Sequence, residues 1–299
     1  MTDETSAGFT RRTSAFLFRH PKVKLGATLS PALAWMIVIY LTSLVMLLVT
    51  SFWRLNELTS QVEQVWGLQN YQKIFANFPD SVYIQVTIRT LIMATLVTLA
   101  DLAMAFPIAY FIARIARPRA RQALLVAVVV PLWANYLVRV FAWKTMLAGG
   151  GPVEYVLNDL LGFNAHLAAS DFAVWITLTY LWLPFTILPI YAALERVPGS
   201  LLDASSDLGA HNLTTFRKVV WPLALPGVVA ASIFSFSLSL GDYLTPTLVG
   251  KNLFIGNLID QLVGTAQNRP LAAAITVIPI VIMAVYLLIA RAFGAFEAL

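Results

Sequence analysis

The feature that most constrains this chain of 299 residues is a series of long apolar runs, each close to the thickness of a bilayer. A helix needs about 20 apolar residues to cross the hydrocarbon core of a membrane. Apolar residues are continuous in each run and do not alternate with polar ones, which favours helices over the strands of a membrane barrel. We predict an all-α membrane protein with six transmembrane helices, over Leu29–Trp53, Val82–Ala113, Gln122–Trp143, Phe172–Leu194, Pro222–Tyr243 and Leu271–Ala292.

The distribution of basic residues predicts the orientation of these helices. Lys and Arg accumulate in cytoplasmic loops, so the net charge of +5 indicates membrane topology, and no nucleic acid partner is expected. With the N-terminus inside, the cytoplasmic bases are Arg11, Arg12, Arg19, Lys22, Lys24, Arg114, Arg117, Arg119, Arg121, Arg196, Arg217, Lys218 and Arg291. Fewer bases lie on the other side, namely Arg54, Lys73, Arg89, Arg139, Lys144, Lys251 and Arg269. Both termini are therefore predicted to be cytoplasmic.

This orientation divides the chain into four parts. Residues 1–28 are a basic cytoplasmic tail, expected to lie against anionic headgroups, and 29–81 hold the first helix and an extracytoplasmic amphipathic segment. That segment either lies on the membrane or contacts an external protein. Residues 82–292 form the membrane core, which includes a cytoplasmic loop at 195–221, and 293–299 are a cytoplasmic C-terminus.

Motifs for bond chemistry are not found in the sequence. It has no cysteine, and no G-x4-G-K-[ST] phosphate loop, H-E-x-x-H pair or G-x-S-x-G elbow. The three histidines, His20, His166 and His211, lie in different segments, so no metal site is predicted. An enzyme embedded in the membrane and a passive channel are therefore distant alternatives to a transport protein.

The cytoplasmic loop contains the amphipathic stretch "SLLDASSDLGAHNLTTFRKVVWPLALPGV", residues 200–228. Ser200 and Asp203 match the start of a capping box, which predicts a short helix that runs to Leu208. Gly209 then allows a tight turn. Asn212 is expected to cap a second short helix, with one apolar face made by Leu213, Phe216 and Val220. Such a loop either folds back on its own membrane domain or docks on a cytoplasmic partner.

Residues in this loop resemble the signature of type I ABC importer permeases, E-A-A-x3-G-x9-I-x-L-P. The matching positions are Asp203, Ala204, Ser205, Gly209, Val219, Trp221 and Pro222. Asp replaces Glu, Ser replaces the second Ala, Val replaces Ile and Trp replaces Leu. Residues 106–114 ("FPIAYFIAR"), 131–162 and 252–274 are similar to the spermidine/putrescine branch of this family. The resemblance covers most of the chain from about residue 82 onward.

The resemblance implies a permease subunit in a bacterial inner membrane that forms half of a pore. Its implied partners are a second homologous permease, two ATPase subunits, an extracytoplasmic solute-binding protein and membrane lipids. ATP and Mg would be used by the ATPase subunits, and this chain would bind no cofactor. The implied solute is a polyamine such as putrescine or spermidine; another small amine, an amino-acid-like solute or a phosphonate is the alternative. The implied coupling residues are Ser200, Asp203, Ala204, Ser205, Gly209, Phe216, Val219 and Pro222.

Polar and aromatic residues within the spans are candidates for the substrate pathway, because ionisable groups in a membrane are costly and aromatic faces attract ammonium groups. The candidates are Asp101, Trp133, Tyr136, Arg139, Asp242 and Tyr243. Each has a structural alternative. Asp101 needs a polar partner inside the bundle, and Arg139 can reach the headgroups. Asp242 can be a solvated helix end or pair with Arg139, and aromatic residues often form interfacial belts.

Overall fold

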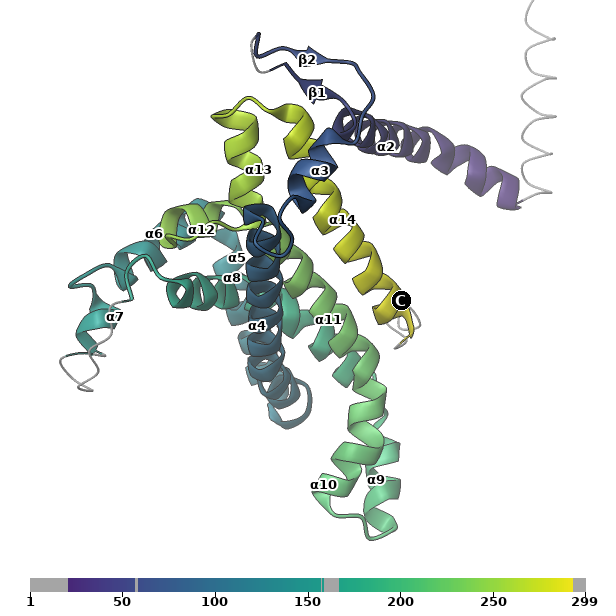
Figure 1. Cartoon of the computed structure of the whole chain (residues 1–299). Coiled ribbons are helices and arrows are strands. Elements are labelled where there is room, and N and C mark those ends of the chain that lie inside the picture. The colour runs from purple at the N-terminus through teal and green to yellow at the C-terminus, as the bar shows by residue number, and fades with distance from the viewer. Residues whose placement is uncertain (1–20, 57–58, 157, 159–166, 293–299) are drawn as a thin grey trace, which may run out of the picture.

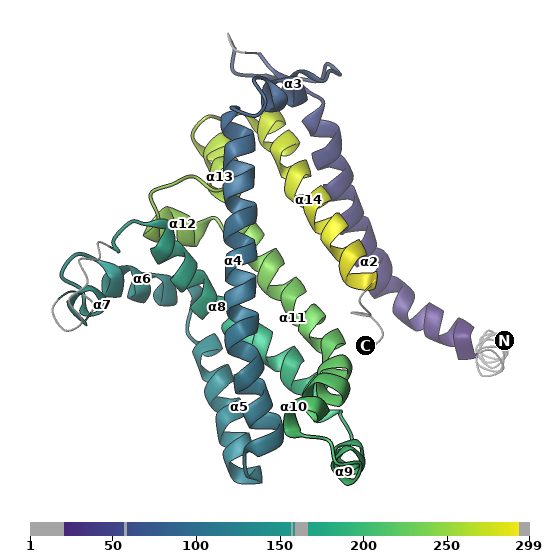
Figure 2. The same ribbon diagram turned by 60° about the horizontal axis from the view of Figure 1, so that its bottom comes forward.

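The computed structural model describes residues 21–56, 59–156, 158 and 167–292, and these are almost entirely helical. Three long helices pack against one another at the centre, α4 (Val82–Tyr110), α8 (Asp171–Glu195) and α11 (Trp221–Gly241). Helices α2 (Pro21–Ser51) and α14 (Arg269–Ala292) run side by side along one flank (Figures 1 and 2). On the opposite flank lie α5 (Pro118–Trp133), α6 (Tyr136–Leu147) and α7 (Pro152–Tyr155).

Five of the six predicted spans are confirmed as helices of sufficient length and apolarity. In the structure they are Thr28–Ser51, Val82–Ile115, Asp171–Glu195, Asn212–Gly241 and Arg269–Ala292. The second of these continues from α4 into a π-helical turn, η1 (Phe111–Ile115). The fifth predicted span begins in the preceding loop as α10 (Asn212–Thr215) and the π-helical η3 (Phe216–Val220), which lead into α11.

The prediction of one continuous third helix over Gln122–Trp143 is wrong. The chain forms α5 and α6 there, which meet at a bend of 91°. Pro131 lies inside the last turn of α5, where its ring removes a backbone donor. Asn135 then accepts a hydrogen bond from the Leu137 amide at 2.9 Å and caps the start of α6. Pro131 and Asn135 both indicate a helix break, but the apolar residues continue on either side of them, so the sequence pattern predicted one helix.

Small residues let α11 approach α8 closely. A Cβ placed on Gly227 of α11 would lie 2.2 Å from the Cβ of Ala193 and 3.0 Å from the carbonyl oxygen of Pro189. Both of those residues belong to α8. Close packing at small side chains is a main source of helix association in membranes, where no hydrophobic force drives helices together.

Gly227→Ala is therefore expected to destabilise the protein by about 1–3 kcal/mol, the usual range for overpacking. The matched control is Gly241→Ala on the same helix, where an added Cβ meets no atom within 4 Å. The melting temperature of the detergent-solubilised protein measures the difference. Equal melting temperatures for the two variants would contradict this account of the α8–α11 contact.

A cap of short elements covers one end of the bundle. It comprises the hairpin of β1 (Arg54–Leu55) and β2 (Val62–Glu63), then α3 (Gln69–Phe75), α12 (Leu244–Val249) and α13 (Ile255–Gly264). In the hairpin, Asn56 and Arg54 both donate to the Glu63 carboxylate, at 2.7 and 2.6 Å, and these bonds lower the pKa of that carboxyl. The hairpin and α3 lie at the end opposite α9 (Gly199–Asp207) and α10 (Figure 1).

The side of the membrane on which each end lies remains a prediction. A reporter fused after Arg121 or Arg217 is expected in the cytoplasm, because the basic residues gather there. A reporter in the 150–168 loop, part of which falls outside the described residues, is expected on the other side. Alkaline phosphatase and fluorescent protein fusions report the two compartments. Activity of the phosphatase at Arg121 or Arg217 would contradict the predicted orientation.

Candidate functional site

The projecting α9–α10 element is built around a turn at Gly209. This glycine has a φ of +72°, in the left-handed region that residues with a side chain adopt with difficulty. Its amide donates to the Ser206 carbonyl at 2.8 Å, and the Ala210 amide donates to the Ser205 carbonyl at 3.1 Å. This pair of bonds is a Schellman motif, the common glycine-dependent end of a helix. The predicted helix, glycine turn and second short helix are confirmed.

The predicted caps of the two short helices are wrong. Helix α9 begins at Gly199 after Pro198, with no side-chain hydrogen bond at its start, so Ser200 and Asp203 form no capping box. Helix α10 begins at Asn212, and the residue before it, His211, also gives no side-chain cap. Pro198, the residue before α9, has a backbone φ that is fixed by its ring. This restriction directs the chain into α9 without a side-chain cap.

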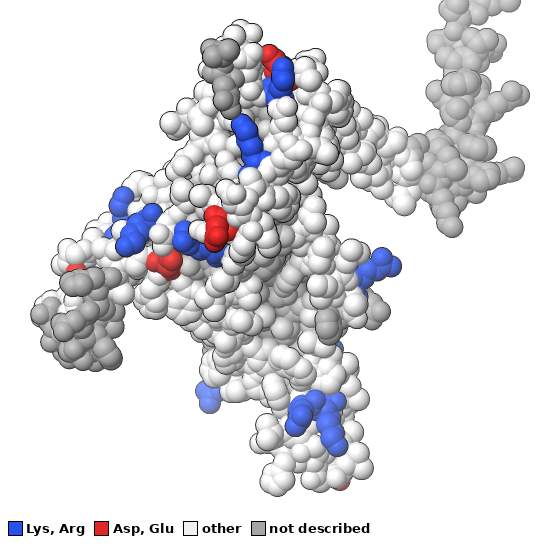
Figure 3. Space-filling view, in the orientation of Figure 1, with Lys and Arg blue, Asp and Glu red and all other residues white. Residues whose placement is uncertain are grey.

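The tip of this element presents apolar side chains to its surroundings. Leu208 is 88% exposed and Leu213 is 75% exposed, while Leu201 is 43% exposed. Leu213 therefore does not share the packed face that was predicted for it with Phe216 and Val220. The exposed bases Arg217 and Lys218 lie one helical turn after Leu213, and Figure 3 shows basic atoms gathered over this end. A leucine tip beside positive charge is typical of a surface that docks on another protein.

Several contacts fix the element to the bundle. The Phe216 ring packs edge-on against Phe106 of α4, with ring centres 5.7 Å apart. Ser205 of α9 and Thr215 of α10 share a hydrogen bond of 2.8 Å between their hydroxyls. Arg114 holds the end of α8 by donating to the carbonyl oxygens of Leu194 and Val197. Phe216 thus braces the element against α4, and Arg114, in the turn η1 that follows α4, ties that helix to the end of α8. A displacement of the element would therefore reach α8 through α4.

A second cluster surrounds Asp242, where α11 ends and α12 begins. Oδ1 of Asp242 accepts hydrogen bonds from the backbone amides of Leu244 and Thr245, at 2.9 and 3.1 Å. Oδ2 accepts from the hydroxyl of Thr245 at 2.8 Å and from the hydroxyl of Tyr136 on α6. The Asp242 carboxylate therefore links α6, the second half of the bent third span, to the end of α11. The amides fix one oxygen of the Asp242 carboxylate, while the other is reached, among the residues that the structure describes, only by rotatable hydroxyls.

Unsatisfied donors lie around Tyr136. Its ring stacks on that of Trp182, with centres 5.9 Å apart, and the buried Nε1 of Trp182 has no hydrogen-bond partner. Arg139, one turn further along α6, interacts electrostatically with Tyr136. Its Nε and Nη1 are also buried and unpartnered. Within the described ranges, Arg139 and Asp242 form no ion pair, so the pairing considered as an alternative is not present in this conformation.

The remaining candidates for the substrate pathway lie outside this cluster. Asp101 is fully buried on α4, and one of its oxygens accepts a 2.5 Å hydrogen bond from Ser235 of α11. The polar partner that Asp101 requires is thus present. Trp133 is 86% exposed at the end of α5, and Tyr243 is 42% exposed beside Asp242. The structure brings together Tyr136, Arg139 and Asp242. Tyr243 is adjacent to Asp242 in the chain but its side chain is not among the hydrogen-bonded groups of the cluster, and Asp101 and Trp133 lie elsewhere.

The sequence did not lead us to predict Thr245 as a member of the cluster, or a contact between Trp182 and Tyr136. A signal for Thr245 was present, because Asp is a preferred residue at the start of a helix and its side chain accepts from the amides two and three residues further on. The contact between Trp182 and Tyr136 depends on the bend in the third span and could not be foreseen. In the part of the chain that the structure describes, no three His, Cys, Asp or Glu residues lie close enough to hold a metal ion.

A bundle of membrane-spanning helices, with a projecting two-helix element at one end and a half-buried polar cluster toward the other, is the architecture of a polytopic membrane protein. The chain belongs to the family of binding-protein-dependent transport system inner membrane components, which matches residues 105–296. It is thus a multi-pass inner membrane protein, an ABC importer permease subunit and not an enzyme.

Two relatives and two solved structures illustrate the similarity. The chain is 39% identical to the inner membrane ABC transporter permease protein YdcU of Escherichia coli K12, over 96% of this chain and 95% of that one. It is 31% identical to the spermidine/putrescine transport system permease protein PotB of the same organism, over 85% and 92%. A bacterial alginate ABC transporter in complex with its pentasaccharide-bound periplasmic protein has the same fold, with 16% identity, a TM-score of 0.74 and coverage of 95% and 97%. The inward-facing methionine transporter MetNI matches with 19% identity and a TM-score of 0.55, over 70% of this chain and 95% of that one.

Proposed function

We propose that this permease imports a polyamine such as putrescine or spermidine. It would form half of the pore with a second permease, above two ATPase subunits that use ATP and Mg, and receive solute from a binding protein. Similarity to PotB at 31% identity supports the solute class, although YdcU, whose name states no solute, is more similar. The described structure adds a carboxylate within an aromatic cluster.

The observation that carries the proposal is the arrangement around Asp242. The two amides on Oδ1 keep the carboxylate oriented, whereas Oδ2 meets only the hydroxyls of Tyr136 and Thr245. An ammonium group is a stronger donor to a carboxylate than a neutral hydroxyl is. A solute ammonium can therefore replace the hydroxyls at Oδ2. The stacked rings of Tyr136 and Trp182 offer faces for a cation nearby.

In the proposed transport cycle, closure of the ATPase pair displaces the α9–α10 element. Because Phe216 braces this element on α4, and Arg114 in η1 bonds the end of α4 to the end of α8, the displacement tilts the central helices as a unit. Helix α11 continues directly from η3 and ends at Gly241, next to Asp242. The same movement thus reaches the Tyr136–Asp242 contact and changes access to Oδ2.

A second candidate solute carries a carboxylate as well as an ammonium group. The observation that favours it is Arg139, whose Nε and Nη1 are buried without a hydrogen-bond partner. Burial of charged N–H groups without an acceptor is costly, and a carboxylate from the solute would satisfy them. For a purely cationic solute, by contrast, Arg139 adds repulsion near Asp242.

Putrescine and 4-aminobutyrate distinguish the two candidates, because they have chains of matched length and differ in one terminal group. The purified complex of permeases and ATPases is heated with each solute, in the absence of a binding protein. The polyamine proposal predicts a higher melting temperature with putrescine and no change with 4-aminobutyrate. The opposite order would establish the second candidate, and no shift with putrescine, spermidine or 4-aminobutyrate would contradict both.

A further inference from the structure

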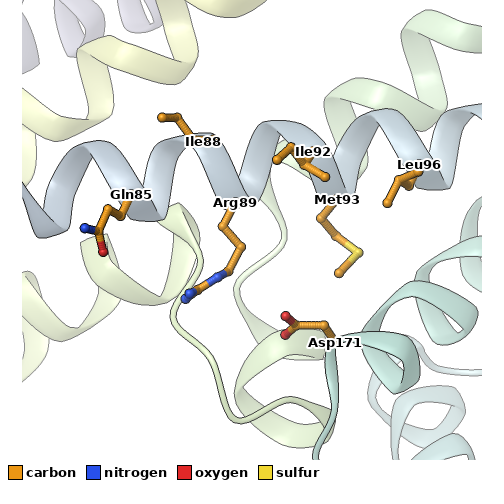
Figure 4. Close-up of a pocket in the computed structure, with 7 residues that line it drawn as sticks. All are labelled: Gln85, Ile88, Arg89, Ile92, Met93, Leu96 and Asp171. Atoms are coloured by element: carbon orange, nitrogen blue, oxygen red, sulfur yellow. The ribbon is translucent and has the colours of Figure 1, made fainter. Parts of the chain in front are cut away.

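A pocket of about 490 Å³ lies along α4, on the side that faces the start of α8. Two opposite charges border it, Arg89 of α4 and Asp171, the first residue of α8. Figure 4 shows their side chains approaching the same space from opposite sides. This pocket is separate from the Asp242 cluster, with which it shares no residue.

Both charged groups retain unused hydrogen-bonding capacity. Arg89 makes one long contact, from Nη1 to the Leu253 carbonyl oxygen at 3.4 Å, and a guanidinium has five N–H donors. Among the described residues, Asp171 accepts only from the side-chain amide of Asn252, at 2.9 and 3.0 Å to its two oxygens. Over the residues that the structure describes, Arg89 and Asp171 form no ion pair. In the pocket, the Arg89 guanidinium is therefore available to bind an anion, and the Asp171 carboxylate is available to bind a cation.

The depth of these charges matches the headgroup region of a bilayer. Arg89 lies seven residues after the start of α4, about 10 Å along the helix axis, and Asp171 opens α8. Helix α4 begins beside α3, at the end of the bundle opposite α9 and α10 (Figure 1). Charges at such depth can meet lipid headgroups without leaving the interface.

An apolar stripe runs from the charged end toward the middle of the membrane. Ile88, Ile92 and Leu96 share one face of α4 at four-residue spacing and are 48%, 55% and 49% exposed. Exposure of this stripe to a water-filled pathway would cost free energy in proportion to its area. Against an acyl chain it costs nothing, because lipid tails are as apolar as the side chains.

We propose that this pocket binds a membrane lipid with a zwitterionic amino-phosphate headgroup, of the phosphatidylethanolamine type. The lipid phosphate receives hydrogen bonds from the Arg89 guanidinium, and the lipid ammonium donates to the Asp171 carboxylate. One acyl chain lies along Ile88, Ile92 and Leu96. An anionic lipid with a glycerol headgroup would leave Asp171 unpaired, so the pocket distinguishes lipids by the headgroup cation.

Native mass spectrometry of the whole transporter complex, purified in detergent, tests this proposal with added palmitoyl-oleoyl lipids. Wild-type complex is expected to retain phosphatidylethanolamine in preference to phosphatidylglycerol. The complex is also expected to retain phosphatidylethanolamine in preference to phosphatidylcholine, whose methylated ammonium has no N–H to donate. Arg89→Gln and Asp171→Asn each remove one charge, and the introduced asparagine side chain would keep an oxygen that accepts from Asn252. Each variant is expected to weaken retention about tenfold, the usual effect of losing a charged hydrogen bond.

Arg269→Gln and Asp260→Asn are the matched controls, because both residues are exposed and outside the pocket. They are expected to retain the lipid as the wild type does. Equal retention by Arg89→Gln and wild type, or equal binding of phosphatidylcholine and phosphatidylethanolamine, would overturn the proposal. Displacement of the lipid by putrescine or 4-aminobutyrate would overturn it too, since the pocket would then be a solute site. If a variant fails to assemble, the lipid competition on the wild-type complex decides.

Discussion

Gly209→Val is expected to assemble with its partners but to lose most of the coupling between ATP hydrolysis and transport. An added Cβ at residue 209 meets no atom within 4 Å, so the substitution creates no clash. Its effect comes from the φ of +72°, which costs an L-residue about 1–2 kcal/mol and a β-branched one more. That strain opposes the Schellman turn and changes the angle between α9 and α10. Solute-stimulated ATPase activity and uptake are expected to fall by about 5- to 30-fold.

Gly209→Asn is the matched control, because asparagine tolerates the left-handed region. It is expected to retain most of the coupling. Both variants are compared in vesicles that hold the complete transporter. If Gly209→Val shows full uptake and full stimulated hydrolysis, the turn has no role in coupling, and the assignment of the α9–α10 element is wrong.

Asp242→Asn is expected to reduce transport of a dication by about tenfold or more, the usual effect of losing a charged hydrogen bond, while the complex still assembles. The asparagine oxygen can still accept from the Leu244 and Thr245 amides, so the start of α12 is preserved. The side-chain amide that replaces Oδ2 is uncharged and cannot attract an ammonium group. Initial uptake rates of putrescine in vesicles, with complex yield as the assembly measure, give the result.

Arg139→Gln and Asp260→Asn accompany this variant. Since Arg139 forms no ion pair with Asp242 among the described residues, we expect no rescue of Asp242→Asn by Arg139→Gln. Asp260 lies in α13, is exposed and serves as a carboxylate removed elsewhere. Poor assembly of Asp242→Asn, restored by Arg139→Gln, would show a structural ion pair instead. Normal uptake by a well-assembled Asp242→Asn complex would leave Asp242 as a helix end with no part in transport.

Much of the fold follows from signals that are local in the sequence. Continuous apolar runs predict the spans, because only helices and closed barrels satisfy all backbone hydrogen bonds inside a bilayer. Gly209 predicts its turn because few other residues adopt that backbone conformation. The permease family was predicted from the spacing of the loop residues from Asp203 to Pro222, and the match over 105–296 confirms it.

The features that were missed depend on competition between signals or on distant contacts. In the third span, Pro131 and Asn135 break the helix, although the apolar pattern continues through both. At α9, Pro198 sets the start that the pattern had assigned to a serine cap. The partners of Asp242 include Tyr136, which lies 106 residues earlier and reaches it only because α6 turns away from α5. No local pattern encodes such a contact.

In the proposed transport cycle, the α9–α10 element receives the work of ATP hydrolysis from a separate subunit. The chain has no cysteine, so one introduced cysteine gives this subunit a single reactive site. Leu213→Cys, at a position that is 75% exposed, is treated with a short thiol cross-linker in the complete complex. We expect a cross-link to the ATPase subunit, with uptake blocked, and none from Leu99→Cys on α4, where Leu99 is 58% exposed. A cross-link from residue 99 and none from residue 213 would contradict this expectation.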